Sequence, residues 1–357
     1  MKKVLIANRG EIAIRIARTC SDLGLKTVGI YSEDDSNSLH LSKVDEAFKI
    51  EGNGAQAYLN IKEIIAVAKK SKVDAIHPGY GFLSENSSFA SAAKRAKIKF
   101  VGPSERTLKI FGDKTSAKEL ALSLGIPVIA GTKQKTTLKQ AEDFLKSLKK
   151  NSSVVIKAIS GGGGRGMRVV SKPDDLKESF DRASSEAKAS FDSPDLYLEE
   201  YLRDYRHIEF QILGDGTGAV SHLHERECSI QRRYQKLIEI APSPSLNVEL
   251  KSRMIEASLA LTKKLKYEGL ATIEFLVNIE KNDFRFIECN PRLQVEHTVT
   301  ESVLSLDLVR AQLQIASGKT LKQIKLEQEN VPEPQGYAIQ SRVNMETIDS
   351  QGNANPG

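Results

Sequence analysis

The run Phe286-Ile-Glu-Cys-Asn-Pro-Arg-Leu-Gln-Val-Glu-His297 brings two glutamates, an asparagine, an arginine and a histidine into one short stretch. The apolar residues that lead into it, Phe284-Arg-Phe-Ile287, are typical of a β-strand. Pro291 cannot donate to a sheet ladder, so the polar half is predicted to leave the sheet. Carboxylate and amide oxygens suit magnesium, whereas the planar guanidinium of Arg292 suits a carboxylate, carbonate or phosphate. Taken alone, the run also fits a solvated loop after an edge strand.

A second predicted strand, Ala271-Thr-Ile-Glu-Phe-Leu-Val277, has an apolar run that is interrupted by Glu274. A buried carboxylate is costly unless it is paired or bound to a metal. Asn282-Asp283 predicts a hairpin turn into the strand that carries Glu288. Because two glutamates on adjacent strands can converge on one cation, the sequence predicts a metal site that Asn290 completes.

The glycine-rich run Ser160-Gly-Gly-Gly-Gly-Arg-Gly-Met-Arg-Val-Val170 permits close backbone approach and a nest of amide groups for phosphate oxygens. It does not match the pattern GxxxxGK[ST] of the Walker P-loop. A flexible linker is the alternative interpretation of such a tract. The strand Val154-Val-Ile-Lys157 before it favours a flap over a nucleotide. A strand ending in lysine, a glycine flap and paired carboxylates together describe an ATP–magnesium site.

Length and composition indicate an ordinary globular protein. The chain has 357 residues, so two or three domains are expected, and 40% of its residues are hydrophobic and 27% charged. The net charge of +6 favours an anionic substrate. No basic run interleaved with aromatic residues is present, so we expect no nucleic-acid partner.

The cysteine pattern and the chain start favour a cytoplasmic protein. Cys20, Cys228 and Cys289 are far apart and odd in number, which excludes a disulfide framework and zinc spacing. The apolar start, Met1 to Ala7, is too short for a signal peptide. No apolar segment approaches the length of a membrane span, so we expect no membrane association.

The N-terminal third predicts a doubly wound α/β domain. Val4 to Ala7 and Thr27 to Tyr31 are expected strands, with a helix from Glu11 to Cys20 between them. The turn between the first strand and this helix lacks GxGxxG, which argues against a dinucleotide site. The loop His77-Pro-Gly-Tyr-Gly-Phe-Leu-Ser-Glu-Asn86 follows a strand, where open α/β sheets bind ligands. It also fits a plain connecting turn.

Strands and helices are expected in the rest of the chain as well. His207 to Leu213 alternates, so His207, Glu209 and Gln211 should share one face of a strand. The polar run from Glu225 to Glu239 suits either an anion or a salt-bridged surface. The other expected elements are a helix from Lys114, a strand and hinge over 196–202, helices over 250–265 and 304–315, a strand over 337–344 that bears Arg342, and no closing element over 349–357.

These motifs, in this order, resemble the biotin carboxylase module of biotin-dependent carboxylases such as acetyl-CoA, propionyl-CoA and pyruvate carboxylase. The resemblance runs from Met1 to about Arg342. It rests on Ile-Ala-Asn-Arg-Gly-Glu11, the 77–86 loop, the 160–170 flap, Gln-Arg-Arg at 231–233 and Arg-Leu-Gln-Val-Glu-His297. It implies an α/β protein with a doubly wound parallel-sheet domain at 1–113, an ATP-grasp domain at 114–330 with a glycine-rich lid at about 131–203, and the start of an incomplete C-terminal domain at 331–357.

The resemblance implies a ligase that carboxylates biotin at N1. ATP and bicarbonate would form carboxyphosphate, with magnesium or manganese as the metal. The implied partners are a biotin carrier domain and a carboxyltransferase component, on the same or another chain, and a homo-oligomer in the full-length protein. The downstream acyl acceptor stays open among acetyl-CoA, propionyl-CoA, a longer acyl-CoA, pyruvate and urea.

The resemblance also implies residue roles. The nucleotide contacts would be Lys114, Lys157, Gly163, Gly164, Glu199, Glu200, Tyr201, Leu202, His207, Gln231 and Tyr234. The metal ligands would be Glu274, Glu288 and Asn290. Lys236, Arg292, Gln294 and Val295 would form the bicarbonate pocket, Glu296 would be the general base, and Arg342 would steady the biotin enolate. Phosphoryl transfer needs charge neutralisation and positioning, and nearby cations hold a carboxylate base ionised.

Two departures from the family pattern leave alternatives open. Tyr234 stands where the family has histidine, and tyrosine can donate a hydrogen bond but carries no charge near neutral pH. The family module also continues beyond the last residue, which leaves open whether the chain is a fragment of a longer protein; no carrier or carboxyltransferase region is expected within these residues. One alternative is a nucleotide-binding scaffold without turnover. Another ATP-grasp ligase, such as a carbamoyl phosphate synthetase, explains Arg292 to His297 and Arg342 poorly.

Overall fold

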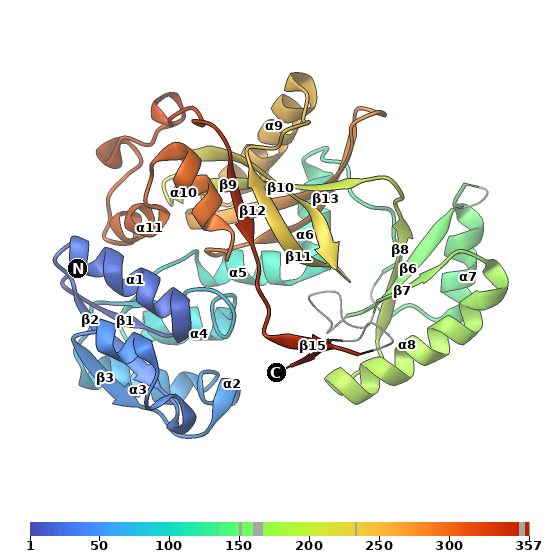
Figure 1. Cartoon of the computed structure of the whole chain (residues 1–357). Helices are drawn as coiled ribbons and strands as arrows, with labels where there is room; N and C mark the ends of the chain where they lie inside the picture. The colour runs from blue at the N-terminus through green and yellow to red at the C-terminus, as the bar shows by residue number, and fades with distance from the viewer. Residues whose placement is uncertain (134, 150–151, 160–166, 233, 350–353, 357) are drawn as a thin grey trace.

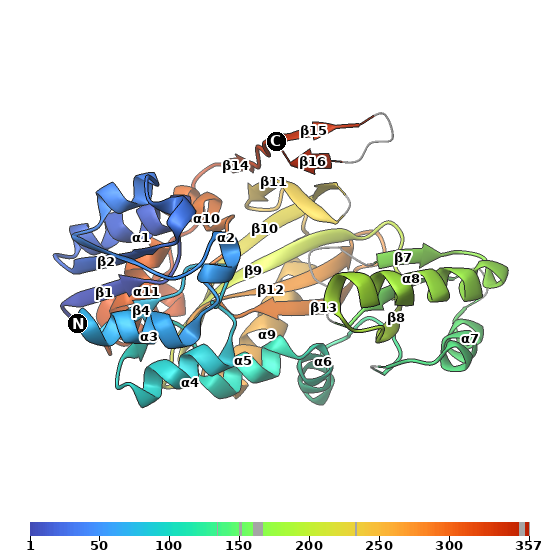
Figure 2. The ribbon, with the colours of Figure 1, turned by 90° about the horizontal axis from the view of Figure 1, so that it is seen from below.

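Three large sheets and a two-stranded pair organise the chain in the computed structural model (Figure 1), which describes residues 1–133, 135–149, 152–159, 167–232, 234–349 and 354–356. A five-stranded sheet contains the N-terminal strands, and a three-stranded sheet lies on the far side of the molecule. Figure 2 shows a six-stranded sheet between them. In the described part of the chain, no helix has the length and apolar character that a membrane crossing requires.

The N-terminal sheet is parallel and has the strand order β3-β2-β1-β4-β5. Val4 and Ile6 of β1 pack with α1 in one core, whereas Leu5, between them, packs with α3 and α4 in another. Helices therefore cover both faces, which confirms the predicted doubly wound domain. The elements are β1 (Lys3–Ile6), α1 (Gly10–Asp22), β2 (Lys26–Tyr31), β3 (Glu46–Lys49), α2 (Gly54–Ala57), α3 (Ile61–Lys70), β4 (Ala75–His77), α4 (Ser87–Arg95), β5 (Lys99–Phe100) and α5 (Glu105–Gly112).

The central sheet is antiparallel, with the order β13-β12-β9-β10-β11-β14. Ile208, Phe210 and Ile212 of β9 pack into the core with α6 and α9, so the alternating polar residues of β9 face the other way. The elements are α6 (Lys114–Ser123), β9 (Arg206–Asp215), β10 (Val220–Arg232), β11 (Gln235–Ala241), α9 (Val248–Lys264), β12 (Glu268–Asn278), β13 (Asp283–Asn290), α10 (His297–Leu304), α11 (Leu308–Ala316) and β14 (Ala338–Ser341).

A small subdomain contains the antiparallel strands β7-β6-β8 and two helices. Its own core includes Ala141, Val154, Ile156, Ala183 and Leu198. In both views it stands apart from the N-terminal sheet, across the central sheet (Figures 1 and 2). Its elements are α7 (Leu138–Ser147), β6 (Ser153–Ala158), β7 (Met167–Val170), α8 (Leu176–Phe191) and β8 (Leu196–Tyr201).

Two expectations about local structure are wrong. The helix expected from Leu304 starts only at Leu308, because Leu304 is the last residue of α10, Ser305 ends that helix with φ of +53°, and Asp307 caps α11 by accepting from the amide of Arg310 at 2.8 Å. The run 225–239, for which an anion site and a salt-bridged surface were both open, is divided, because Glu225 to Cys228 are buried in β10 whereas Ile230 and Tyr234 are exposed. The tail also forms a paired element, since β15 (Glu346–Ile348) pairs with β16 (Ala354–Pro356).

Candidate active site

A cavity of about 690 Å³ lies between the small subdomain and the polar face of the central sheet. Its lining combines residues from β6, β8, β9, β12 and β13, so its shape depends on how the two sheets meet. Of the predicted site residues, Lys114, Lys157, Glu199, Glu200, Tyr201, Leu202, His207, Gln231, Tyr234, Glu274 and Glu288 line it. Gly163 and Gly164 lie outside the described residues.

Apolar side chains that the sequence analysis missed also line this cavity, among them Ile129, Met167, Leu276 and Ile287. They form an apolar surface against which the flat ring of a ligand would pack, as small-molecule pockets usually do. Leu276 could have been found from strand alternation, because it lies two residues after Glu274 on the same strand and so on the same face.

Glu199 is paired with two lysines at one end of the cavity. Lys157 Nζ lies 2.5 Å from Oε2 of Glu199, and Lys118, which was not predicted, donates to Oε1. Burial alone would raise the pKa of Glu199, but the two ammonium groups lower it to about 2. Lys114 lies over the ring of Tyr197, with its Nζ 5.8 Å from the ring centroid. Lys114 and Lys157 both line the cavity, so this end of it carries two ammonium groups suited to phosphate oxygens.

The predicted metal ligands come together on adjacent strands. Glu274 of β12 lies opposite Glu288 of β13 in the strand register, and Asn290 Nδ2 donates to Oε1 of Glu274 at 2.8 Å. Burial raises the pKa of Glu288, and the charge of Glu274 raises it further. A divalent cation would relieve this repulsion with the oxygen ligands that it prefers, so these residues fit a magnesium or manganese ion.

A β-bulge at Ile287 determines where Glu288 points. Phe286 pairs with Phe275 and Glu288 pairs with Glu274, so Ile287 is an extra residue on β13. Phe284 and Phe286 lie in the core. Strict alternation would send Glu288 to the core as well, and the bulge turns it to the cavity instead.

Lys236 contacts three carboxylates at the same time. Its Nζ lies 2.6 Å from Glu209 Oε2, 2.8 Å from Glu274 Oε1 and 2.7 Å from Glu296 Oε1. Burial opposes the charge, but the carboxylates, Glu209 first, hold the pKa of Lys236 well above its usual range. His207 Nε2 lies 2.9 Å from Glu274 Oε2, so Glu274 contacts both His207, a candidate nucleotide-binding residue, and Lys236.

Both carboxylate oxygens of Glu296 are held by cations. Lys236 donates to Oε1, and Arg342 Nη2 donates to Oε2 at 2.9 Å. Burial raises the pKa of Glu296, but Lys236, Arg226 and Arg342 outweigh it and lower the pKa to about 2. Glu296 is therefore ionised at neutral pH, as a general base must be.

Arg292 and Gln294 extend this network. Arg292 Nη2 donates to Asn290 Oδ1 at 3.3 Å, and its Nε lies 3.4 Å from Glu85 of the 77–86 loop. Gln294 Nε2 donates to Glu274 Oε1 at 3.3 Å. Val295 and Arg342 line a second cavity of about 600 Å³. Hydrogen bonds and ion pairs thus connect Glu274 with Asn290 and Arg292 and, through Lys236, with Glu296, whereas Glu288 is placed beside Glu274 by strand pairing.

Arg226 is a buried arginine beside the candidate site, and the sequence analysis did not identify it. Its side chain is 0% exposed, and it donates to Glu209 Oε1 at 2.6 Å and to Gln211 Oε1 at 2.8 Å. It also lies 3.5 Å from Oε1 of Gln294. No local pattern marks this arginine, because its partners come from strands that are remote in sequence.

Tyr234 lies in the turn between β10 and β11, where its φ is +66° and its side chain is 44% exposed. It lines the first cavity from the rim. Gln231 Nε2 lies 2.8 Å from Nδ1 of His207, so these two predicted contacts are joined on neighbouring strands.

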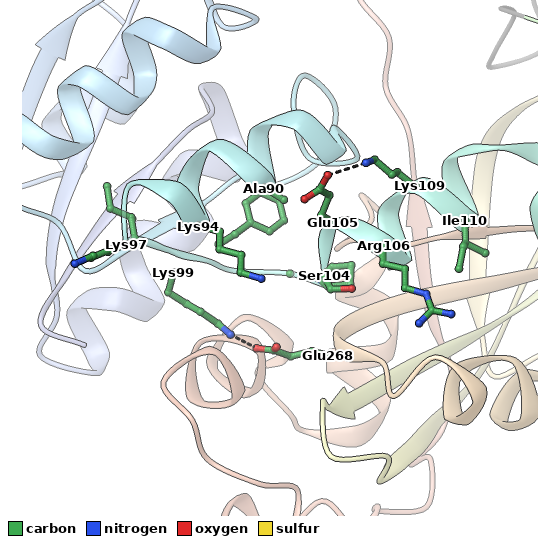
Figure 3. Close-up of a pocket in the computed structure, with 14 residues that line it drawn as sticks. Ala90, Lys94, Lys97, Lys99, Ser104, Glu105, Arg106, Lys109, Ile110 and Glu268 are labelled. Atoms are coloured by element: carbon green, nitrogen blue, oxygen red, sulfur yellow. Dashed lines mark hydrogen bonds and ion pairs between the residues drawn. The ribbon is translucent and has the colours of Figure 1, made fainter.

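A separate cavity of about 940 Å³ lies between α4, α5 and the start of β12 (Figure 3). Lys99 and Glu268 form an ion pair across it at 2.5 Å, and Lys109 pairs with Glu105 at 2.7 Å. None of the predicted site residues lines this cavity, so we do not assign it to the candidate active site.

Two family models match the chain in sequence order. The N-terminal domain of biotin carboxylase matches residues 1–108, and the ATP-binding domain of the carbamoyl-phosphate synthase L chain matches residues 113–324. The pyruvate carboxylase of Bacillus subtilis (strain 168) is 49% identical over 355 residues. That alignment covers 97% of this chain but only 30% of the relative.

Solved structures of biotin carboxylases also match the chain, and these matches cover a larger share of the related protein. The biotin carboxylase domain of Hydrogenobacter thermophilus 2-oxoglutarate carboxylase, a dimer in complex with MgADP, ADP and bicarbonate, has a TM-score of 0.91 and 42% identity. The match covers 97% of this chain and 75% of that domain. Biotin carboxylase from Campylobacter jejuni has a TM-score of 0.91 and 41% identity, over 98% of this chain and 77% of that one.

Proposed function

Because the chain belongs to the biotin carboxylase family of ATP-grasp ligases, we propose that it uses ATP and bicarbonate to carboxylate biotin, the first half-reaction of a biotin-dependent carboxylase. The biotin would be carried by a carrier domain, on the same or another chain. The proposal stops at carboxybiotin, since related domains serve carboxylases of pyruvate and of 2-oxoglutarate.

One structural observation carries the proposal. A continuous set of contacts runs from Glu274, in the first cavity, through Lys236 and Glu296 to Arg342, at the second cavity. Each link is 2.7 to 2.9 Å long. The first cavity would hold the nucleotide and the second would admit biotin, so bicarbonate would be activated between them.

Within this arrangement Lys114 and Lys157 would bind the phosphates and neutralise charge that develops during transfer. A magnesium or manganese ion held by Glu274, Glu288 and Asn290 would neutralise further phosphate charge. Lys236, Arg292, Gln294 and Val295 would hold bicarbonate. Glu296 would accept the bicarbonate proton, and the bicarbonate oxygen would then attack the γ-phosphorus as the bond to ADP breaks.

The low pKa of Glu296 has a mechanistic consequence. A carboxylate with a pKa of about 2 is ionised but is a weak base. Bicarbonate bound beside it would compete for Lys236 and Arg342, which would raise the pKa of Glu296 and strengthen it as a base. Arg342 would then be available to stabilise the negative charge of the biotin enolate.

We further propose that the chain divides into domains at 1–113, 114–330 and 331–357, with a lid at about 131–203. The family matches to residues 1–108 and 113–324 support the first of these boundaries. We also propose that a carboxyltransferase component is a partner and that the full-length protein forms a homo-oligomer. The free, buried thiols of Cys20, Cys228 and Cys289 support a cytoplasmic location.

The test is an assay of the purified chain with ATP, magnesium, labelled bicarbonate and free biotin. We expect ADP release that requires bicarbonate, rises with biotin and yields labelled carboxybiotin. Glu256→Gln, at an exposed position of α9, is the matched control for Glu296→Gln. Nucleotide binding without ADP release would instead select a scaffold, and a different carboxylated or carbamoylated product would select another ATP-grasp ligase.

A further inference from the structure

Glu239 of β11 is a buried carboxylate that has no role in the site described so far. Its side chain is 0% exposed. Its Oε1 accepts from Nε of Arg342 at 2.6 Å, and its Oε2 accepts from Nε2 of Gln340 at 3.3 Å. Glu239 lies opposite Gln340 in the pairing of β11 with β14. One of its partners therefore lies on β14, and the other is the residue that directly follows this strand.

Arg342 needs such a partner because of where it lies. It follows the last residue of β14, its amide still donates to Leu237 O at 2.9 Å, and the next residue, Val343, is 94% exposed. An arginine side chain loses much conformational entropy when it is fixed in one geometry. One contact to Glu296 through Nη2 would leave the guanidinium free to rotate about that point.

The two carboxylates contact different nitrogen atoms of the guanidinium. Glu239 takes Nε, whereas Glu296 takes Nη2. Because the guanidinium is planar, fixing two of its nitrogens fixes the direction of the third. Arg342 also lines the second cavity, together with Val295.

We propose that Glu239 is a positioning residue that acts through Arg342, holding the guanidinium at Nε so that its other nitrogens face Glu296 and the second cavity. This inference rests on the proposed function, because the second cavity is where biotin would enter. It adds a requirement that the sequence motifs do not contain.

A purely structural role for Glu239 is the competing explanation. Burial and the charge of Glu296 raise the pKa of Glu239, while Arg342 lowers it. A buried carboxylate is costly unless it is paired, so this residue does not stabilise the fold by itself. A better-packed apolar residue could join β11 to β14 equally well. A test must therefore separate action through Arg342 from sheet stability.

The kinetic test is a double-mutant cycle on the intact chain, with Glu239→Gln, Arg342→Ala and the double variant, and with Glu256→Gln as the control. Biotin-dependent ADP release should fall about 10- to 100-fold in Glu239→Gln, as misplaced catalytic groups usually cause. In the Arg342→Ala background the same change should have less than about a twofold effect, because both act through one contact. An equal loss in both backgrounds would overturn the proposal.

A second measurement does not depend on turnover. The ¹⁵N signal of the Arg342 Nε–H group, assigned by its loss in Arg342→Lys, should be protected from exchange with water in the parent chain and in Glu256→Gln. It should lose that protection in Glu239→Gln and, if this variant does not fold, in the shorter Glu239→Asp. Unchanged protection would refute the positioning role. Protection as expected in a parent chain without biotin-dependent turnover would refute only the proposed function.

Discussion

The ammonium of Lys236 lies 2.7 Å from Oε1 of Glu296, and this contact joins β11 to the residue that precedes α10. The same ammonium contacts Glu209 and Glu274, so Lys236 links three buried carboxylates, of which Glu209 is also paired with Arg226 and Glu296 with Arg342. The first prediction concerns the loss of this shared cation.

Replacing Lys236 by methionine should destabilise the protein and abolish biotin-dependent turnover. Breaking a buried ion network by removing one partner costs about 3 to 5 kcal/mol in free energy of unfolding, because the buried carboxylates each lose a counter-charge while they stay out of water. Urea unfolding measures the loss. Lys109→Met removes an exposed pair with Glu105 and should change stability by no more than about 1 kcal/mol. Equal effects of the two substitutions would contradict this account.

Replacing Glu296 by glutamine should lower kcat by about 100-fold or more, because the proton acceptor is lost while the side-chain shape is kept. The binding of ATP, measured by calorimetry, should change little. The pKa of Glu296 is lowered to about 2, so its charged form persists down to strongly acid pH. We therefore expect no inflection of kcat/KM from this group between about pH 5 and 9. An inflection in that window that disappears in Glu296→Gln would show that the group titrates there.

Glu199 should make stability depend on acid pH. Its folded pKa is lowered to about 2, whereas an unfolded glutamate titrates near about 4.3. The stabilisation is therefore complete above the unfolded value and is lost as the pH falls toward 2. Glu199→Gln should cost about 2 to 4 kcal/mol at pH 7, and the difference from the parent chain should shrink below about pH 4. Urea unfolding at several pH values tests this, and a constant difference would rule out the linkage.

Replacing Tyr234 by histidine, the residue of the family pattern, should change nucleotide binding modestly. Tyr234 lies at the exposed rim of the first cavity, so at most one hydrogen bond is exchanged. A hydrogen bond contributes about 0.5 to 1.5 kcal/mol, which limits the change in KM for ATP to roughly tenfold. Steady-state kinetics should show kcat within about twofold of the parent value. A large fall in kcat would place Tyr234 in the chemical step.

The sequence by itself predicted the doubly wound N-terminal sheet, the polar face of β9 and the grouping of polar residues at the end of β13. Continuous apolar runs such as Val4 to Ala7 belong to strands that are covered on both faces, and alternation over 207–213 belongs to a strand with one polar face. These patterns are local, because strand geometry repeats every two residues. The residues from Glu288 to Glu296 lie close in the chain, so one strand end was enough to group them.

Only the tertiary structure decided which charges are buried and which strands meet. Arg226, Glu209 and Glu239 are fully buried, although charged residues are usually exposed, because each finds its partner on another element. The bulge at Ile287, which turns Glu288 toward Glu274, depends on the pairing of β12 with β13. Pairing and burial arise from contacts between residues remote in sequence, and local periodicity does not encode such contacts.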